Sequence, residues 1–324
     1  MEASRNPIPL TVVIPVYQGA ATIGPLVDSL VASLSGGYSL EIVLVNDCSV
    51  DDSEQECIRL FEKYTSIVKF YSLAKNVGEH NAVMAGLNKA TGEWVVIMDD
   101  DFQNPVSEVV KLVTFAVTHT YDVVYTHYVK KKHAFFRNVG SKFNDKVATL
   151  LLKKPANLYL SSFKAVNRFL VNEIIKYTLP FPYIDGLILG VTSNIGTLQV
   201  EHCTRGHGKS NYSLKKLISL WINSFTNFSV LPLRLSTGIG FIFAALGFFV
   251  AIEMIVEKIL NPSLPVGYAF LVFLVTIFAG TQLIAIGMAG EYIGRMFLSQ
   301  NKKPQYSIRK AFESKERPDS ASRL

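Results

Sequence analysis

The first hundred residues alternate short apolar runs with longer stretches of helix-forming composition. The apolar runs are nearly continuous, which is typical of parallel strands that are covered on both faces. Strands are expected at residues 11–17, 41–47, 68–73 and 94–98, and helices at residues 20–34, 53–64 and 79–90. This alternation predicts βαβ units and a doubly wound α/β domain, in which ligands bind at the carboxyl ends of the strands.

Two long uncharged segments follow near the end of the chain. Residues 235–252 are 18 residues without a charge, and residues 259–290 are 32 more. Spans at about residues 238–256 and 267–288 approach the ~20 residues that cross a bilayer, so they predict a transmembrane hairpin. The alternative is a pair of buried helices in a large soluble core.

Basic residues flank this predicted hairpin on both sides. Arg234 precedes it, and Arg295, Lys302 and Lys303 follow its second span. Positively charged flanks favour the cytoplasmic side, and the first ten residues lack the apolar core of a signal peptide. We therefore expect a multi-pass protein of the inner membrane with a cytoplasmic N-terminal domain, and a mobile tail after Ser307.

The positive charge of the chain is concentrated in one window. The chain is 49% hydrophobic and 18% charged, with a net charge of +6. Residues 129–154 hold eight basic residues and one acid, or +7, so the other 24 basic and 25 acidic residues sum to −1. This composition excludes a disordered chain and a uniformly basic nucleic-acid coat. Three scattered cysteines exclude a disulfide framework and a C-x-x-C zinc site.

An acidic cluster, Asp99-Asp100-Asp101, directly follows a predicted buried strand, and Gln103 comes two residues later. Alternate residues of an extended chain point the same way, so Asp99 and Asp101 are able to face one ligand. Clustered carboxylates are costly to desolvate without a cation, and oxygen ligands suit Mg²⁺ or Mn²⁺. The alternative is a solvated acidic turn.

Two further segments carry candidate ligand groups. Asp47 and Ser49 end the second predicted strand, where they either bind ribose or a base edge or cap the next helix. Arg205 and Lys209 lie in a glycine-containing loop that suits a phosphate, or that forms a flexible basic turn near lipid headgroups. The chain has neither a G-x-G-x-x-G nor a P-loop motif.

The basic window itself has the pattern of an amphipathic helix. Arg137 and Ser141 are four residues apart and share a helical face, and phenylalanines are interleaved with the basic residues around them. This pattern favours a helix that lies on an anionic membrane surface. Nucleic-acid binding is disfavoured because the rest of the chain is not basic and has no RNA-binding signature.

Together these motifs resemble the family 2 glycosyltransferases, in the branch that transfers sugars to polyprenyl phosphates such as undecaprenyl or dolichyl phosphate. The resemblance covers roughly residues 10–306. It rests on IPVY at residues 14–17, VNDCSVD at 45–51, NVGEHNAVMAG at 76–86, MDDDFQNP at 98–105, RGHGKSNYSLKKL at 205–217, PLRL at 232–235 and GTQLIAIGMAGEYIGRMF at 280–297.

The resemblance implies an architecture. It implies a cytoplasmic GT-A-like nucleotide-sugar domain over residues 1–230, with membrane-facing amphipathic helices at about 130–155 and 213–230. A two-helix transmembrane anchor at 231–300 and a cytoplasmic tail at 301–324 would follow. Similar proteins are often tetramers, so a homo-oligomer is expected.

The resemblance also implies roles for individual residues. A uridine-type nucleotide would be bound by Pro15, Tyr17, Asp47, Ser49, Asp99 and Asp100, and Mg²⁺ or Mn²⁺ would be held by Asp101, Gln103 and Asp99. The acceptor phosphate would lie near Arg137 and Ser141, and Arg205 and Lys209 would bind phosphates of the donor or the acceptor. The family usually has glycine where this chain has Cys48 and aspartate where it has Asn46. Its usual D-x-D reads Asp99-Asp100-Asp101 here.

The implied reaction is an inverting transfer of a sugar from a nucleotide sugar to polyprenyl phosphate, for modification of cell-envelope glycans such as lipopolysaccharide. Asp99, Asp101, Arg137 and Arg205 are the expected catalytic group. Asp185, in PYIDG, is either a positioning residue near the sugar or a structural loop acid. The alternatives are a processive polysaccharide synthase, whose Q-x-x-R-W motif this chain lacks, and a non-catalytic, membrane-anchored sugar-nucleotide-binding protein.

Overall fold

The computed structural model describes residues 7–128, 155, 158–180, 182–201, 231–261, 267–300 and 304–314. The chain divides into two compact units. The first comprises Met1–Asn211 together with Lys303–Leu324, and the second comprises Tyr212–Lys302.

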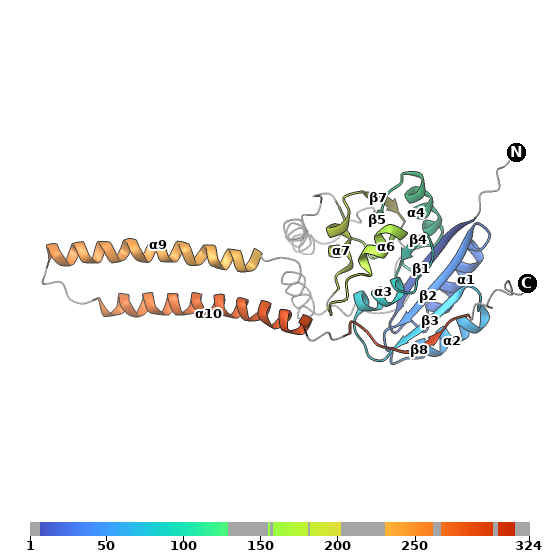
Figure 1. Ribbon diagram of the computed structural model, residues 1–324, viewed down its shortest axis with the longest axis horizontal. Helices are drawn as coiled ribbons and strands as arrows, with labels where there is room; N and C mark the ends of the chain where they lie inside the picture. Colours follow the sequence, from blue (N-terminus) through green and yellow to red (C-terminus); the bar gives the residue numbers. More distant parts are fainter. Residues whose placement is uncertain are drawn as a thin grey trace, which may run out of the picture. The chain divides into compact units, whose positions relative to one another are not determined.

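Among the described residues of the first unit, eight strands form one mixed sheet in the order β7-β5-β6-β4-β1-β2-β3-β8 (Figure 1). The strands are β1 (Ile8–Val16), β2 (Tyr38–Asn46), β3 (Val68–Leu73), β4 (Trp94–Ile97), β5 (Val123–Tyr128), β6 (Lys164–Asn167), β7 (Ile195–Val200) and β8 (Ile308–Phe312). The first four strands are parallel to one another, as the apolar runs predicted. The strand β6 runs antiparallel to both β4 and β5, so the α/β sheet is mixed.

Helices cover both faces of this sheet. They are α1 (Ile23–Leu34), α2 (Ser53–Lys63), α3 (Glu79–Leu87), α4 (Val106–Thr118), α6 (Arg168–Ile174) and α7 (Ile184–Val191). The first, second and fourth of them bury their apolar side chains on one face, and α3, α6 and α7 on the other. The alternation along β1 divides the two cores, because Val12 and Ile14 face α1 whereas Val13 faces α3.

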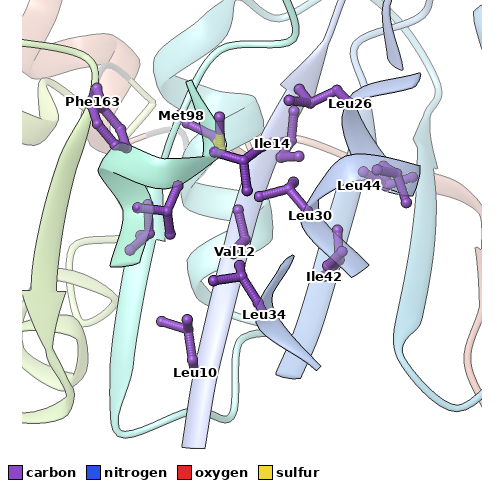
Figure 2. Packing of buried hydrophobic residues seen from close by; sticks show 14 of the residues in the cluster. Leu10, Val12, Ile14, Leu26, Leu30, Leu34, Ile42, Leu44, Met98 and Phe163 are labelled. Carbon is purple, nitrogen blue, oxygen red and sulfur yellow. The ribbon is translucent and has the colours of Figure 1, made fainter. Parts of the chain in front are cut away.

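Figure 2 shows the first of these cores, where Val12 and Ile14 of β1 lie against Leu26 and Leu30 of α1. All four side chains are fully buried. Each such burial contributes about 1.5–3 kcal/mol to folding relative to exposure. The core therefore holds β1 rigidly, and β1 carries one of the loops of the candidate site.

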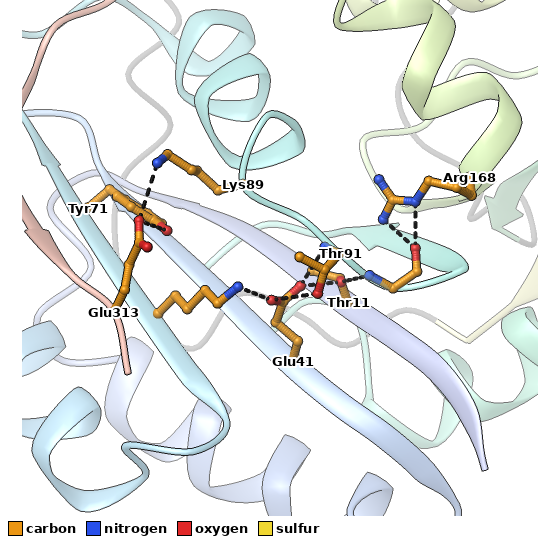
Figure 3. A network of polar contacts seen from close by, with 9 residues as sticks. Thr11, Glu41, Tyr71, Lys89, Thr91, Arg168 and Glu313 are labelled. Carbon is orange, nitrogen blue, oxygen red and sulfur yellow. Dashed lines mark hydrogen bonds and ion pairs between the residues drawn. The ribbon is translucent and has the colours of Figure 1, made fainter. Parts of the chain in front are cut away.

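The segment after Ser307 departs from the expectation of a mobile tail. Residues Ile308–Phe312 form β8, which pairs antiparallel with β3. Phe312 stacks on Phe70 with ring centroids 5.6 Å apart, and the Glu313 carboxylate accepts a hydrogen bond of 2.7 Å from Tyr71 Oη (Figure 3). The expectation was wrong here, because β3 would otherwise be an edge strand with unpaired backbone groups.

The second unit contains α9 (Leu231–Leu260) and α10 (Tyr268–Gln300). The rings of Phe243 and Phe278 contact each other between the two helices, with centroids 6.5 Å apart. Within the part of the chain that the structure describes, no helix is both long enough and apolar enough to cross a membrane. The predicted transmembrane hairpin is therefore not confirmed.

Candidate active site

Three loops meet at the carboxyl ends of β1, β2 and β4, at the edge where the sequence predicted a ligand. Each loop contains one residue in the left-handed region, namely Gln18 (φ 57°), Cys48 (φ 55°) and Phe102 (φ 62°). Hydrogen bonds join the first two loops, because the backbone N–H of Gln18 donates to Ser49 Oγ at 3.1 Å. Left-handed residues turn the chain sharply, so all three strands end in compact loops.

The three adjacent aspartates point to different partners. Asp100 Oδ2 accepts a hydrogen bond of 3.1 Å from the backbone N–H of Tyr17. Asp99 Oδ2 accepts one of 2.6 Å from the Ser162 hydroxyl, and Asp101 Oδ1 accepts one of 3.2 Å from the N–H of Gln103. The middle aspartate therefore anchors the β1 loop, while Asp99 is held by the chain that leads into β6.

The approach of Asp100 to the β1 loop is close enough to require a glycine. A Cβ at position 19 would overlap Asp100 Oδ2, so only glycine leaves room for the carboxylate. Burial raises the pKa of Asp100 to about 7; the Tyr17 N–H opposes this, whereas the charges of Asp99 and Asp101 add to it. A cation beside this cluster would relieve that repulsion.

Asp47 and Ser49 anchor loops in this structure. Both oxygens of Asp47 accept backbone N–H groups, from Val77 at 2.7 Å and from Gly78 at 2.9 Å. Burial raises the pKa of Asp47, and these two N–H groups oppose the shift. Tyr17, the residue that follows β1, is 47% exposed. The nucleotide-binding roles of these residues and of Pro15 stay predictions.

Asn46 stands where the family that the sequence resembles usually has an aspartate. The neighbours of its side chain account for an amide at this position. It is fully buried, and its Nδ2 donates to Ser72 Oγ at 3.3 Å while its Oδ1 accepts the N–H of Ser49 at 3.1 Å. An ionised carboxylate has no hydrogen to donate, so the amide is better suited to this position.

Among the described residues, no group of three or more His, Cys, Asp or Glu side chains is arranged to hold a metal ion. The donor set of Asp99, Asp101 and Gln103 nevertheless has the right chemistry, because all three offer side-chain oxygen atoms beside the crowded negative charge of Asp100. These residues fit a hard divalent cation such as Mg²⁺ or Mn²⁺.

Asp185 lies in the first turn of α7 and is only 8% exposed. Its Oδ1 forms an ion pair with Lys164 Nζ and accepts a hydrogen bond of 2.9 Å from Tyr125 Oη. The sequence alone did not indicate Lys164, Tyr125 or Ser162 as neighbours of the site. A lysine at the start of an apolar strand was the available signal, because a buried lysine needs an acidic partner.

Arg137, Ser141, Arg205 and Lys209, the residues predicted to bind phosphates, lie outside the described residues. A cavity of about 210 Å³ lies at the opposite edge of the sheet, near the starts of β1, β2 and β3. It is lined by residues that include Glu41 and Lys69, and none of the predicted site residues contributes to it.

The fold and the acidic loop define an α/β protein of the kind whose ligands generally bind at the carboxyl ends of the strands. The family model described as "Glycosyl transferase family 2" matches residues 11–175. This chain belongs to that family and is a glycosyltransferase.

Similar proteins agree with this assignment. The chain is 32% identical over 306 residues to the undecaprenyl-phosphate 4-deoxy-4-formamido-L-arabinose transferase of Serratia proteamaculans, covering 93% of each chain. It is 31% identical over 304 residues to the transferase of the same name from Photorhabdus laumondii, again covering 93% of each. A crystal structure of glucosyl-3-phosphoglycerate synthase from Mycobacterium tuberculosis, in complex with Mn²⁺, UDP-glucose and phosphoglyceric acid, superimposes with a TM-score of 0.51. It shares 18% identity and covers 68% of this chain and 78% of that one, which shows a common fold.

Proposed function

We propose that this glycosyltransferase moves a sugar from a UDP-linked donor to undecaprenyl phosphate, with inversion at the anomeric carbon. The relatives named for undecaprenyl-phosphate transfer support the lipid acceptor. The observation that most supports a nucleotide-sugar donor is the acidic loop after β4. Hydrogen bonds connect this loop to the β1 loop and to Ser162. The product would be a polyprenyl-monophosphate sugar for cell-envelope glycans.

In this proposal the donor lies across the carboxyl ends of β2, β1 and β4. Tyr17 offers an exposed ring for the nucleoside, beside Pro15, Asp47 and Ser49. The carboxylates of Asp99 and Asp101 and the amide of Gln103 would hold Mg²⁺ or Mn²⁺. When bound, the ion offsets the negative charge that develops on the departing nucleoside diphosphate.

The acceptor is a phosphate monoester whose second pKa is about 6, so it is largely a dianion near neutral pH. One of its oxygens forms a bond to the anomeric carbon while the bond from that carbon to the diphosphate oxygen breaks. The electron pair leaves with the nucleoside diphosphate, and no strong base is needed. Arg137, Arg205 and Lys209 counter the repulsion between the two anions, and Ser141 adds a hydrogen bond.

The proposal includes attachment to a membrane through α9 and α10, as a homo-oligomer with a cytoplasmic catalytic domain over residues 1–230. Its support is the sequence of the two helices and the exposed apolar side chains that they carry. Phe241, Phe248 and Phe249 on α9 and Leu283 and Ile284 on α10 are each more than half exposed. Apolar surface of this extent is unfavourable in water and is stabilised in lipid.

The test uses membranes that contain the full chain, incubated with undecaprenyl phosphate and nucleotide sugars labelled in the sugar. We expect the label to become extractable with lipid and this transfer to stop when EDTA is added. Membranes with a chain that carries Asp101→Ala are the matched control. Absence of lipid-linked label across a broad donor panel would contradict the proposed function.

A further inference from the structure

A second polar cluster lies beside the acidic loop, and it consists of Lys164, Asp185 and Tyr125. Lys164 is 3% exposed and stands in register with Ile97, the last residue of β4, and with Tyr125 on β5. Its Nζ lies 5.1 Å from the centre of the Tyr125 ring and pairs with Asp185. The proposed transfer step uses none of these three side chains.

The cluster is joined to the acidic loop through the segment that enters β6. Ser162, two residues before Lys164, donates its hydroxyl to Asp99. Lys164 in turn pairs with Asp185. A short stretch of chain, from Ser162 to Lys164, therefore links the carboxylate of Asp99 to that of Asp185.

The order of these groups along the sheet matches the order of parts in a nucleotide sugar. The strands run β5-β6-β4-β1-β2, so the nucleotide loops of β2 and β1 come first, the acidic loop of β4 next, and Lys164 on β6 last. Neighbouring strands lie about 4.8 Å apart, so β2 and β6 are about 14 Å apart. With the nucleoside over β1 and β2 and the diphosphate at β4, the sugar faces β6 and α7.

Asp185 has an oxygen available at this position. Both Lys164 and Tyr125 bind its Oδ1, and among the described residues Oδ2 has no hydrogen-bond partner. The Asp185 side chain keeps 11% of its surface exposed. The neighbouring wall is aromatic, because His80 on α3 packs edge-on against Tyr183 at the start of α7, with ring centroids 5.2 Å apart.

We propose that Asp185 is a positioning residue for the donor sugar: its Oδ2 accepts a hydrogen bond from a sugar hydroxyl, while Lys164 and Tyr125 fix the carboxylate through Oδ1. This rests on the proposed function. A buried ion pair by itself stabilises a fold little compared with well-packed apolar residues. A pair retained beside the acidic loop, with Oδ2 of Asp185 used by neither Lys164 nor Tyr125, is better explained by selection among donors.

The test compares the full-length wild type with the double variant Lys164→Met/Asp185→Leu, which replaces the whole pair and leaves no unpaired buried charge. The matched control is Lys63→Met/Asp28→Leu, which removes an exposed lysine–aspartate pair between α1 and α2. Affinities are measured by calorimetry for UDP and for the UDP-sugars of a panel that includes UDP-glucose and UDP-N-acetylglucosamine. A thermal melt of each variant checks folding.

We expect the Lys164/Asp185 variant to lose about tenfold or more in affinity for the transferred UDP-sugar, with less than a twofold change for UDP. The control should change neither affinity. Equal losses for UDP and UDP-sugar, or no loss for either, would overturn the proposal. If the double variant does not fold, the variant Tyr125→Phe is measured in its place. It keeps the aromatic ring and removes one hydrogen bond to Asp185. An unchanged affinity of this variant for the UDP-sugar would overturn the proposal.

A wild type that neither binds nor transfers any UDP-sugar of the panel overturns the proposed function, and the role of Asp185 with it. A wild type that transfers sugar, beside a Lys164/Asp185 variant with unchanged preference for UDP-sugar over UDP, overturns only the role of Asp185.

Discussion

Cys48 occupies a position where the backbone is strained, and replacing it with glycine should stabilise the protein. Its φ of 55° lies in the left-handed region, where a Cβ costs about 1–2 kcal/mol. Glycine removes this cost but adds about 0.5–1 kcal/mol of chain entropy on unfolding. The Cys48 thiol contributes little, because its Sγ lies 4.0 Å from the carbonyl oxygen of Ala74.

The net effect of Cys48→Gly is therefore a stabilisation of about 0.75 kcal/mol, the difference between the midpoints of the two ranges. For a domain of this size that raises the Tm by about 1–4 °C. The assay is a thermal melt of the purified protein, with Cys48→Ala as the control, because alanine keeps the Cβ and loses only the thiol. A Tm of Cys48→Gly equal to or below that of Cys48→Ala would refute the argument from strain.

Three further predictions concern the site and its support. Asp101→Ala should lower kcat/KM at least about a hundredfold by removing a ligand of the ion, with an unchanged thermal melt; near-normal turnover in defined Mg²⁺ or Mn²⁺ would contradict the assignment. Arg137→Ala should raise the KM for undecaprenyl phosphate by at least about tenfold and leave the KM for the nucleotide sugar within about twofold; equal increases would refute an acceptor-specific role. Burial raises the pKa of Glu41, but hydrogen bonds from Lys69, Thr11 and Thr91 outweigh it and lower the pKa below the unfolded value (Figure 3). The ionised Glu41 carboxylate therefore contributes its full stabilisation above its unfolded pKa of about 4.3, and this stabilisation is lost as the pH falls through the lower folded pKa. Because glutamine does not titrate, the Tm of Glu41→Gln should fall less below about pH 4 than the Tm of the wild type.

The parallel half of the fold was predictable from the sequence because its signal is local. Each strand from β1 to β4 is an apolar run followed by a helix, and that pattern also places Asp47 and Asp99 at the same edge of the sheet. The antiparallel strands were not predictable in this way. The strand β6 has only four residues, and its position between β4 and β5 depends on pairing with strands distant in the chain.

The sequence predicted which residue types form the site and at which edge of the sheet they lie. It did not predict the hydrogen bonds between them. The sequence placed three aspartates together, but the division of labour among them depends on the Tyr17 N–H and the Ser162 hydroxyl, which come from other loops. The pair between Lys164 and Asp185 likewise joins residues that only the packing of α7 against the sheet brings together.

The strand after Ser307 also depends on contacts with residues that are distant in the chain. The composition of this segment is polar, and no local pattern indicates the strand with which it pairs. The open edge of β3 and the stacking of Phe312 on Phe70 make β8 favourable only in the folded domain. Its order is therefore a property of the whole sheet.

The proposed reaction transfers a sugar, without its phosphate, to undecaprenyl phosphate. The most direct measurement is mass spectrometry of the lipid formed when the purified full chain is incubated with undecaprenyl phosphate, Mg²⁺ or Mn²⁺, and a panel of UDP-sugars. We predict a product heavier than undecaprenyl phosphate by one glycosyl residue, with UDP released. A product that also gains the donor's phosphate, with UMP released, or no lipid product with any donor, would contradict it.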